Sequence, residues 1–164
     1  MKKVGIVMGS DSDLPILKKT MDTLNALDIP FEVHVYSAHR TPEQARDFAR
    51  FARENGFGVM IAAAGMAAHL AGAIAANTTL PVIGIPCASQ NMDGLDALLS
   101  TVQMPSGIPV ATVAVGGGVN AALLAAQMLA IEDADLAAKL DAKRATDAAV
   151  VLEKDAKIAA EWNK

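Results

Sequence analysis

Three short stretches hold most of the residues in this sequence that could bind or transform a small molecule. They read GSDSD at residues 9–13, SAHRTP at residues 37–42 and AAGMAAHL at residues 63–70. Glycine, small polar and ionisable residues gather in them, although 52% of the chain is hydrophobic and only 20% is charged. This concentration of polar groups in an apolar chain predicts that the stretches line one binding site.

His39 and Arg40 are the residues best suited to proton transfer and to anion binding. An imidazole donates and accepts protons near neutral pH, and a guanidinium presents a fixed fork of donors to a phosphate or carboxylate. The competing interpretation of His39 is a surface-loop histidine without a role. We interpret His69 as a core histidine that hydrogen-bonds a backbone carbonyl near the ligand, and His34 as a structural residue within a strand.

Residues 9–13 precede a predicted helix, so their backbone N–H groups and hydroxyls could receive an anion or the hydroxyls of a sugar. The simpler interpretation is that Ser12 or Asp13 only caps this helix. The acidic pair Asp11 and Asp13 also suggests a receiver-type magnesium site. Residues 63–65 argue against it, because Ala-Ala-Gly offers no carboxylate that could be phosphorylated after the third strand.

No metal-binding or disulfide motif is recognisable, and we expect no metal. The three histidines lack the paired spacing of a zinc site. Cys87 is the only cysteine, so we interpret it as a buried small hydrophobic residue. The glycines at residues 116–118 lack the spacing of a dinucleotide fingerprint, and we expect them to form a close-approach turn before a core helix.

Strands and helices alternate along the chain in the way that is typical of parallel βαβ units. The alternation predicts an α/β fold: a three-layer α/β/α sandwich around a flavodoxin-like five-stranded parallel sheet in the order 2-1-3-4-5. In such a sheet ligands bind at the carboxyl ends of the strands, where the three polar stretches fall. The predicted strands cover residues 4–8, 31–36, 59–63, 82–85 and 110–115, and predicted helices include residues 66–76, 95–101, 119–131 and 133–164.

A helix start signal follows the second predicted strand. Thr41 is predicted as the N-cap, Pro42 as the first helical residue and Gln44 as the residue that completes a capping box. Apolar residues at helical spacing then predict the core-facing stripes of two helices. These stripes consist of Leu14, Leu17, Met21 and Leu24 after the first strand, and of Ala45, Phe48, Ala49 and Ala52 after Thr41.

Charge and hydropathy exclude several classes of partner. The net charge of −4 at pH 7 argues against a nucleic-acid-binding protein, which would present a basic face. Residues 59–76 approach the length of a membrane span, but a histidine and two glycines interrupt them, so we expect a strand, a loop and a buried helix. The N-terminal apolar run is too short for a signal peptide, which together with the single cysteine predicts a cytoplasmic protein.

Residues 120–131 predict a helix that is apolar almost all round, whereas a surface helix of a small domain should carry a polar stripe. We therefore expect this helix to pack on its own sheet and on a second copy of the chain in a homo-oligomer. An unusually alanine-rich monomer is the alternative. Residues 1–164 are predicted to form a single domain whose C-terminal helix, from about residue 133, packs on neighbouring subunits.

Five strings in the chain, taken together, resemble the class I family of 5-(carboxyamino)imidazole ribonucleotide mutases. The strings are MGSDSD, SAHRTP, AAGMAAHLAG, GLDALLSTVQMPSGIPVATVA and NAALLAA, in this order, between about residues 4 and 131. The resemblance implies an isomerase of de novo purine biosynthesis that needs no cofactor and forms a homo-octamer with sites at subunit contacts. It would convert 5-(carboxyamino)imidazole ribonucleotide to 5-amino-4-carboxyimidazole ribonucleotide through CO₂ and aminoimidazole ribonucleotide.

The resemblance also implies a role for individual residues. His39 falls on the position of the catalytic histidine, which acts as general acid and base. Ser10, Asp13 and Arg40 fall on nucleotide-binding positions, with Arg40 at the phosphate. The remaining implied substrate-binding residues lie on the loops that line the pocket: Ser12, Ser37, Ala38, Gly65, Ala67, Ala68, His69 and Leu70.

The sequence departs from the family pattern at a few positions, and two alternative functions stay open. Met66 and Ala71 stand where the family more often has Gly and Pro, and residues 87–91 differ from the usual string. One alternative is a class II-type aminoimidazole ribonucleotide carboxylase that uses free CO₂, although that class has Lys at the position of Arg40 and lacks the AAHL string. The other is a non-catalytic flavodoxin-like nucleotide-binding module, for which one Trp and one Tyr provide few aromatic side chains.

Overall fold

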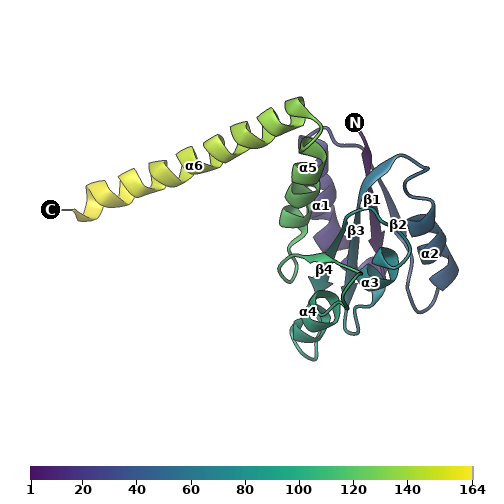
Figure 1. Ribbon diagram of the computed structural model, residues 1–164. Coiled ribbons are helices and arrows are strands. Elements are labelled where there is room, and N and C mark those ends of the chain that lie inside the picture. Colours follow the sequence, from purple (N-terminus) through teal and green to yellow (C-terminus); the bar gives the residue numbers. More distant parts are fainter. Residues whose placement is uncertain (164) are drawn as a thin grey trace.

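A parallel five-stranded sheet forms the centre of the computed structural model, which describes residues 1–163 (Figure 1). The strands lie in the order β2-β1-β3-β4-β5 and every neighbouring pair is parallel, which confirms the predicted topology. The strand order reverses between β1 and β3, and this switch point is where open α/β sheets bind ligands. The strands are β1 (Lys3–Met8), β2 (Phe31–Val35), β3 (Phe57–Gly65), β4 (Val82–Cys87) and β5 (Ala111–Thr112).

The three central strands are nearly continuous apolar runs because helices cover both faces of the sheet. Every residue of β4 is buried, as is every residue of β1 after Lys3. β5 pairs over only two residues, so the strand predicted at residues 110–115 is too long. Beyond β5, single hydrogen bonds such as Gly116 N to Pro86 O (2.9 Å) hold the chain beside β4.

Two apolar cores, one on each face of the sheet, make up the three layers. The core that contains Ile6, Ile61 and Ile83 packs against α1 and α5, whereas the core that contains Val7 and Met60 packs against α2 and α3. The helices are η1 (Asp11–Asp13, a 3-10 turn), α1 (Leu14–Ala26), α2 (Pro42–Arg50), α3 (Leu70–Ala75), α4 (Leu95–Val102), α5 (Gly118–Ala130) and α6 (Ala134–Trp162).

Close contact between α1 and α5 explains the small residues in this part of the chain. A Cβ on Gly118 would lie 2.5 Å from the backbone O of Ile16, so only glycine fits there. The Thr20 hydroxyl donates a hydrogen bond to Gly118 O at 3.0 Å. Gly118 therefore makes the predicted close approach, and Gly116, with a φ of +70°, forms the turn before it. Four fully buried alanines continue the close packing along α5: Ala121, Ala122, Ala125 and Ala126.

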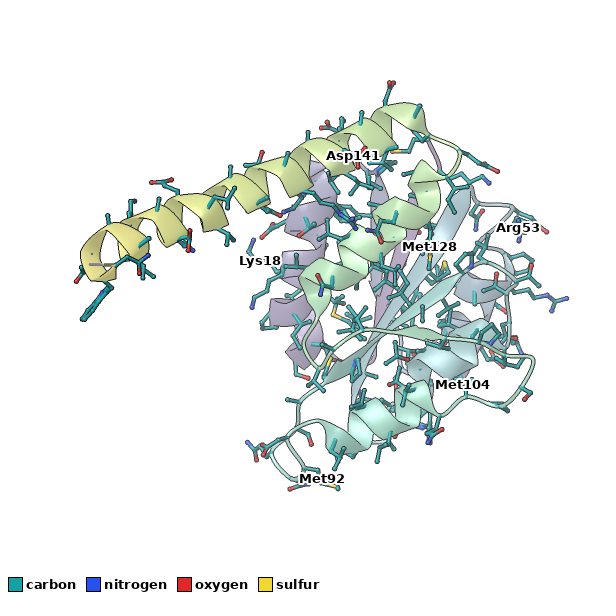
Figure 2. The ribbon with its side chains drawn as sticks, turned by 60° about the vertical axis from the view of Figure 1, so that its left-hand side comes forward. Lys18, Arg53, Met92, Met104, Met128 and Asp141 are labelled. Atoms are coloured by element: carbon teal, nitrogen blue, oxygen red, sulfur yellow. The ribbon has the colours of Figure 1, made fainter. Side chains whose placement is uncertain are left out.

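The long helix α6 extends away from the rest of the chain, as Figures 1 and 2 both show. Its start is anchored by Asp133, whose side chain accepts a hydrogen bond from Leu136 N, and by Lys139, whose Nζ lies 2.7 Å from an Asp28 carboxylate oxygen. Leu136 is the only residue of α6 that is buried. The second half of α6 exposes a set of large apolar side chains: Val150, Val151, Leu152, Ile158 and Trp162.

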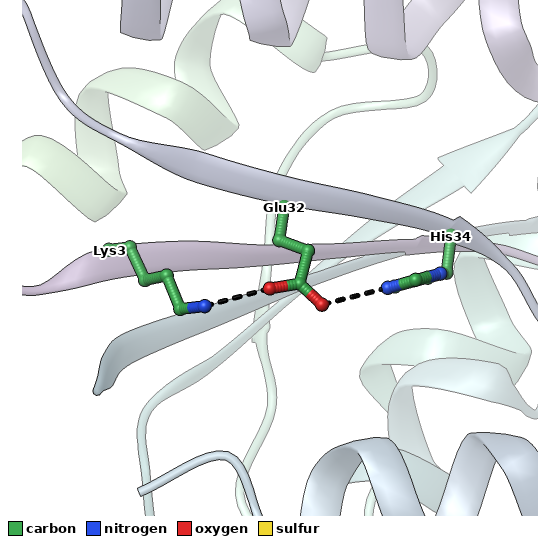
Figure 3. Close-up of polar contacts among 3 residues, drawn as sticks. All are labelled: Lys3, Glu32 and His34. Atoms are coloured by element: carbon green, nitrogen blue, oxygen red, sulfur yellow. Dashed lines mark hydrogen bonds and ion pairs between the residues drawn. The ribbon is translucent and has the colours of Figure 1, made fainter. Parts of the chain in front are cut away.

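On the edge strand β2 and just after it, the polar and aromatic side chains pack against other residues and the valines do not. His34 stacks on Tyr36 with ring centroids 4.8 Å apart, and Phe48 of α2 packs edge-on against both rings. Glu32 bridges Lys3 and His34, with distances of 2.7 and 2.9 Å to Lys3 Nζ and His34 Nε2 (Figure 3). Val33 and Val35, by contrast, are exposed.

Two local predictions about helices are corrected. Thr41 occupies the N-cap of α2, but no capping box forms, because its hydroxyl turns back to Ser37, accepting from Ser37 N (2.8 Å) and donating to Ser37 O (3.2 Å). Leu14 lies at the start of α1 and is exposed, so it does not belong to the core stripe that Leu17 and Leu24 form. The stripe at Ala45, Ala49 and Ala52 is buried as predicted.

Residues 59–76 form the predicted succession of strand, loop and buried helix. The helical part, α3, is only six residues long and begins at Leu70, four residues later than predicted. Within residues 1–163, no helix is both long enough and apolar enough to cross a membrane.

Candidate functional site

A cavity of about 620 Å³ opens at the carboxyl edge of the sheet and joins the three polar stretches of the sequence. It extends along the ends of β2, β1, β3 and β4, across the switch point. Of the predicted site residues, Ala68 alone does not line the cavity wall, since it is buried in the protein. The predicted residues that do line it are Ser10, Ser12, Asp13, Ser37, Ala38, His39, Arg40, Gly65, Ala67, His69 and Leu70.

His39 and His69 contact each other at the cavity wall. His39 Nε2 lies 2.8 Å from His69 Nδ1, and the two rings meet edge-on. Both residues are exposed, so the interpretation of His69 as a core histidine bound to a backbone carbonyl is wrong. One of the two nitrogens must carry the proton that the other accepts. The pair can therefore hold a proton at the cavity and orient the His39 ring.

The loop after β2 is organised by Ser37 and attached to β1 by Arg40. Ser37 Oγ accepts hydrogen bonds from His39 N (3.3 Å) and Arg40 N (3.2 Å), which closes a tight turn. Arg40 Nη2 donates to Gly9 O at 3.0 Å. Within residues 1–163, Arg40 has no carboxylate partner, so its charge is available to an anion in the cavity.

Asp13 is a buried carboxyl at the start of α1, with 8% of its surface exposed. It does not cap the helix, and neither does Ser12; the side chain of Ser10 caps η1 instead by accepting from Ser12 N at 3.3 Å. Burial raises the pKa of Asp13, and the nearby Cys87 thiol partly offsets this rise. The Asp13 side chain therefore faces the cavity as an acceptor with few protein partners.

Cys87 ends β4 beneath the cavity and is 2% exposed. Burial, together with the nearby Asp13 carboxyl, raises the pKa of the Cys87 thiol to about 12. The thiol therefore stays protonated at neutral pH and is a poor nucleophile. This agrees with its interpretation as a small buried residue, whose Sγ donates to Ile85 O at 3.7 Å.

Two features of the cavity were missed in the sequence. Ala88 and Ser89, which follow β4, also line the wall, because the carboxyl end of β4 lies next to that of β3. Met66, in the loop after β3, has a φ of +55°, a left-handed conformation that favours glycine. The position of residues 88 and 89 after a predicted strand was the available signal for the first feature. The Gly that the family more often has at position 66 was the signal for the second.

Among residues 1–163, no group of three His, Cys, Asp or Glu side chains is placed to hold a metal ion. The ionisable groups at the cavity are instead two histidines, one arginine and the acidic residue Asp13. This set of groups can move protons and bind an anion.

The fold is that of a flavodoxin-like α/β protein, with a cavity lined by two histidines and an arginine at the switch point of its sheet. Comparison with known proteins then identifies the family. The sequence model of AIR carboxylase matches residues 3–149, and the chain belongs to the AIR carboxylase family.

Several similar proteins cover almost the whole chain. The N5-carboxyaminoimidazole ribonucleotide mutase of Bacillus subtilis is 55% identical over 152 residues, which are 92% of this chain and 94% of that protein. The mutase of the same name from Mycobacterium tuberculosis is 53% identical, covering 95% and 90% of the two chains. The crystal structure of Treponema denticola PurE superimposes with a TM-score of 0.84 at 29% identity, covering 94% of this chain and 96% of that one.

Proposed function

We propose that this chain is an N5-carboxyaminoimidazole ribonucleotide mutase of purine biosynthesis. The observation that carries the proposal is that proteins of this name are 53–55% identical to the chain over nearly their whole length. The cavity supports it, since His39, Arg40 and Asp13 supply a proton carrier, a cation and a hydrogen-bond acceptor in one place. The reaction moves a carboxylate from the exocyclic amine of the imidazole to ring carbon four.

His39 serves as the general acid and base of this transfer. The C–N bond to the carboxylate breaks, CO₂ leaves, and the amine nitrogen takes a proton from the imidazolium of His39. Ring carbon four then forms a C–C bond to CO₂ and loses its proton to His39, which returns the histidine to its starting state. No redox change occurs, and a positioned acid and base of this kind contributes roughly 10²–10⁴-fold to the rate. His69 orients the ring through the 2.8 Å contact.

The other groups bind the nucleotide and retain CO₂. Arg40 binds the phosphate, and Ser10 and Asp13 bind hydroxyls of the ribose, with Ser12, Ser37 and Ala38 beside them. The small-residue loop from Ala63 to Ala68 encloses CO₂ and excludes water, which prevents loss of the intermediate. Gly65, Ala67, His69 and Leu70 line the cavity beside it. Arg40 and the AAHL string at residues 67–70 favour the mutase over a class II-type carboxylase. The presence of both His39 and Arg40 argues against a non-catalytic nucleotide-binding module.

The protein acts as a cytoplasmic homo-oligomer, which the family resemblance makes an octamer. Residues 1–164 form a single domain, and α6 packs on neighbouring subunits. The exposed apolar side chains of α6, such as Leu152 and Trp162, support this assembly, because burying them against another subunit removes apolar surface from water. Sedimentation at micromolar concentration tests it: a species of monomer mass contradicts it.

An isotope experiment tests the reaction itself. The protein is mixed with 5-(carboxyamino)imidazole ribonucleotide labelled with carbon-13 in its carboxylate, in a large excess of unlabelled bicarbonate. We expect the label to appear in 5-amino-4-carboxyimidazole ribonucleotide, because the enclosed CO₂ does not exchange with solvent. Extensive dilution of the label, or efficient turnover of aminoimidazole ribonucleotide at ordinary bicarbonate levels, contradicts a mutase and indicates a class II-type carboxylase.

A further inference from the structure

Ser89 has a buried polar atom that is left without a partner at the cavity. Its Oγ is inaccessible to solvent and forms no hydrogen bond within residues 1–163. No other buried side-chain nitrogen or oxygen in this part of the chain lacks a partner. A buried hydroxyl without a hydrogen bond is unfavourable, so such a group in a folded protein calls for a partner that the chain itself does not provide.

The end of β4, just before Ser89, is fixed by contacts with neighbouring segments of the chain on both sides. Gly65 and Cys87 are paired at the ends of β3 and β4, and a Cβ on Gly65 would lie 3.2 Å from Cys87 O. On the other side, Gly116 N donates to Pro86 O at 2.9 Å. Ser89 itself lines the cavity wall. The hydroxyl can change its direction only by rotation about χ1, since the strand ends that carry it are fixed.

Ser89 and Arg40 lie at opposite ends of the cavity. Arg40 follows β2 and Ser89 follows β4, and β1 and β3 separate these two strands. Three strand spacings place the two loops about 14 Å apart along the sheet edge. The contact between His39 and His69 lies between them, because His69 follows β3.

We propose that the Ser89 hydroxyl donates a hydrogen bond to the carboxylate that the reaction transfers, and so orients it beside the histidine pair. The proposal rests on the proposed function, since it takes the phosphate to be at Arg40. A nucleotide with its phosphate at the β2 end directs its base past His39 toward the β4 end. The anionic group on that base is a strong acceptor, and a hydrogen bond to it satisfies the hydroxyl that the free protein leaves unpaired.

The variant Ser89→Ala, compared with Ser89→Thr, tests the proposal by titration calorimetry with two nucleotides. The probes are 5-amino-4-carboxyimidazole ribonucleotide and aminoimidazole ribonucleotide, which differ only in the carboxylate. For Ser89→Ala we expect the Kd of the carboxylated nucleotide to rise about tenfold and that of the other to stay unchanged. Ser89→Thr, which keeps the hydroxyl, should bind both within about threefold of the parent protein.

Urea unfolding of the ligand-free protein separates binding from a structural role. Ser89→Ala should unfold at the same or a higher urea concentration, because it removes an unpaired buried hydroxyl. The matched control is Ser100→Ala on α4: Ser100 Oγ donates to Asp96 O at 2.6 Å, so its loss should lower stability and leave both Kd values unchanged. A lower unfolding midpoint for Ser89→Ala overturns the proposal.

The two proposals fail in different ways. If the parent protein binds neither nucleotide, the proposed function is wrong. If the parent protein binds both nucleotides and converts 5-(carboxyamino)imidazole ribonucleotide to 5-amino-4-carboxyimidazole ribonucleotide, while Ser89→Ala binds the carboxylated nucleotide equally well, only the role of Ser89 is wrong. Equal weakening of both nucleotides also overturns that role, because the hydroxyl would then contact the part that they share.

Discussion

The two edges of the sheet are both hollowed, yet they differ in how their polar groups are satisfied. The hollow at the amino edge, near Arg50, Arg53 and Thr79, is the larger, about 1000 Å³ against about 620 Å³ at the carboxyl edge. At the amino edge Arg53 Nη2 donates to Thr79 Oγ1 at 3.0 Å, so these two polar side chains are hydrogen-bonded to each other. Neither size nor positive charge therefore distinguishes a site in this molecule.

The carboxyl edge differs in holding polar groups whose partners the fold does not supply. Asp13 is buried with few partners and the Ser89 hydroxyl is unpaired, whereas left-handed backbone occurs at both edges, at Met66 and at Asp28. Unfavourable local features of this kind gather where a ligand is bound, because binding compensates for them. Loops there also lead from strands into helix N-termini, which present N–H groups. The comparison teaches that unsatisfied groups, rather than cavity volume, mark the functional edge.

The largest effect expected is on turnover, from His39→Asn at the carboxyl edge. Asparagine keeps the polarity of the position but cannot exchange a proton near neutral pH, so turnover should fall by roughly 10²–10⁴-fold. Following the ultraviolet change of the nucleotide measures it. Arg53→Gln at the amino edge is the control and should leave turnover unchanged. Wild-type-like turnover of pure His39→Asn would remove the distinction between the edges.

Asp13→Asn is expected to have two smaller effects of opposite sign: it should raise the stability of the ligand-free protein and weaken nucleotide binding. Burial raises the pKa of Asp13, so the folded protein binds this proton more tightly than the unfolded chain does. Ionised Asp13 therefore costs stability, and that cost grows as pH rises above the ordinary carboxyl range. At pH 7 the variant should be more stable than the parent protein by about 1 kcal/mol without ligand, and should bind nucleotide more weakly.

Urea unfolding at pH 7 and near pH 3, with and without aminoimidazole ribonucleotide, measures both effects of Asp13→Asn. The stability gain should shrink at the lower pH, where Asp13 is protonated in both states. A variant that is less stable at pH 7 would show that the Asp13 carboxylate supports the fold.

Replacing Met66 by Gly should stabilise the ligand-free protein by about 1 kcal/mol. Glycine adopts the left-handed conformation at position 66 without the steric cost that Met66 bears at φ +55°. The matched control is Met92→Gly, another exposed methionine in a loop at the same edge, whose φ is not positive. It should be neutral or destabilising. Thermal unfolding compares the two, and equal shifts would mean that Met66 stores no strain.

The smallest effect is expected from Glu32→Gln, away from the carboxyl edge (Figure 3). Hydrogen bonds from His34 and Lys3 lower the pKa of Glu32, so the stability they contribute is present above its ordinary value of 4.5 and lost as pH falls through the lowered pKa. Since 43% of the Glu32 side chain is exposed, solvent screening limits the loss at pH 7 to a few tenths of a kcal/mol. Urea unfolding should show the variant and the parent protein converging near pH 3. A loss that persists there would point to packing.

The sequence by itself determined the sheet order and the placement of the three polar stretches at one edge. Apolar runs and helical spacing act over a few residues, and the rules of parallel βαβ connection convert them into a topology. The local signals located the stretches at residues 9–13 and 37–42, and the family resemblance implied every individual residue now found on the cavity wall from the loops after β1 and β2 except Gly9.

Only the tertiary structure decided which partner each polar side chain has. The hydroxyl of Thr41 bonds Ser37 instead of completing a capping box, and His69 meets His39, 30 residues earlier in the chain. Ser89 joins the cavity because β4 ends beside β3. A hydrogen bond depends on distances within about 1 Å between elements that sequence spacing does not relate, so these contacts exist only once the layers have packed.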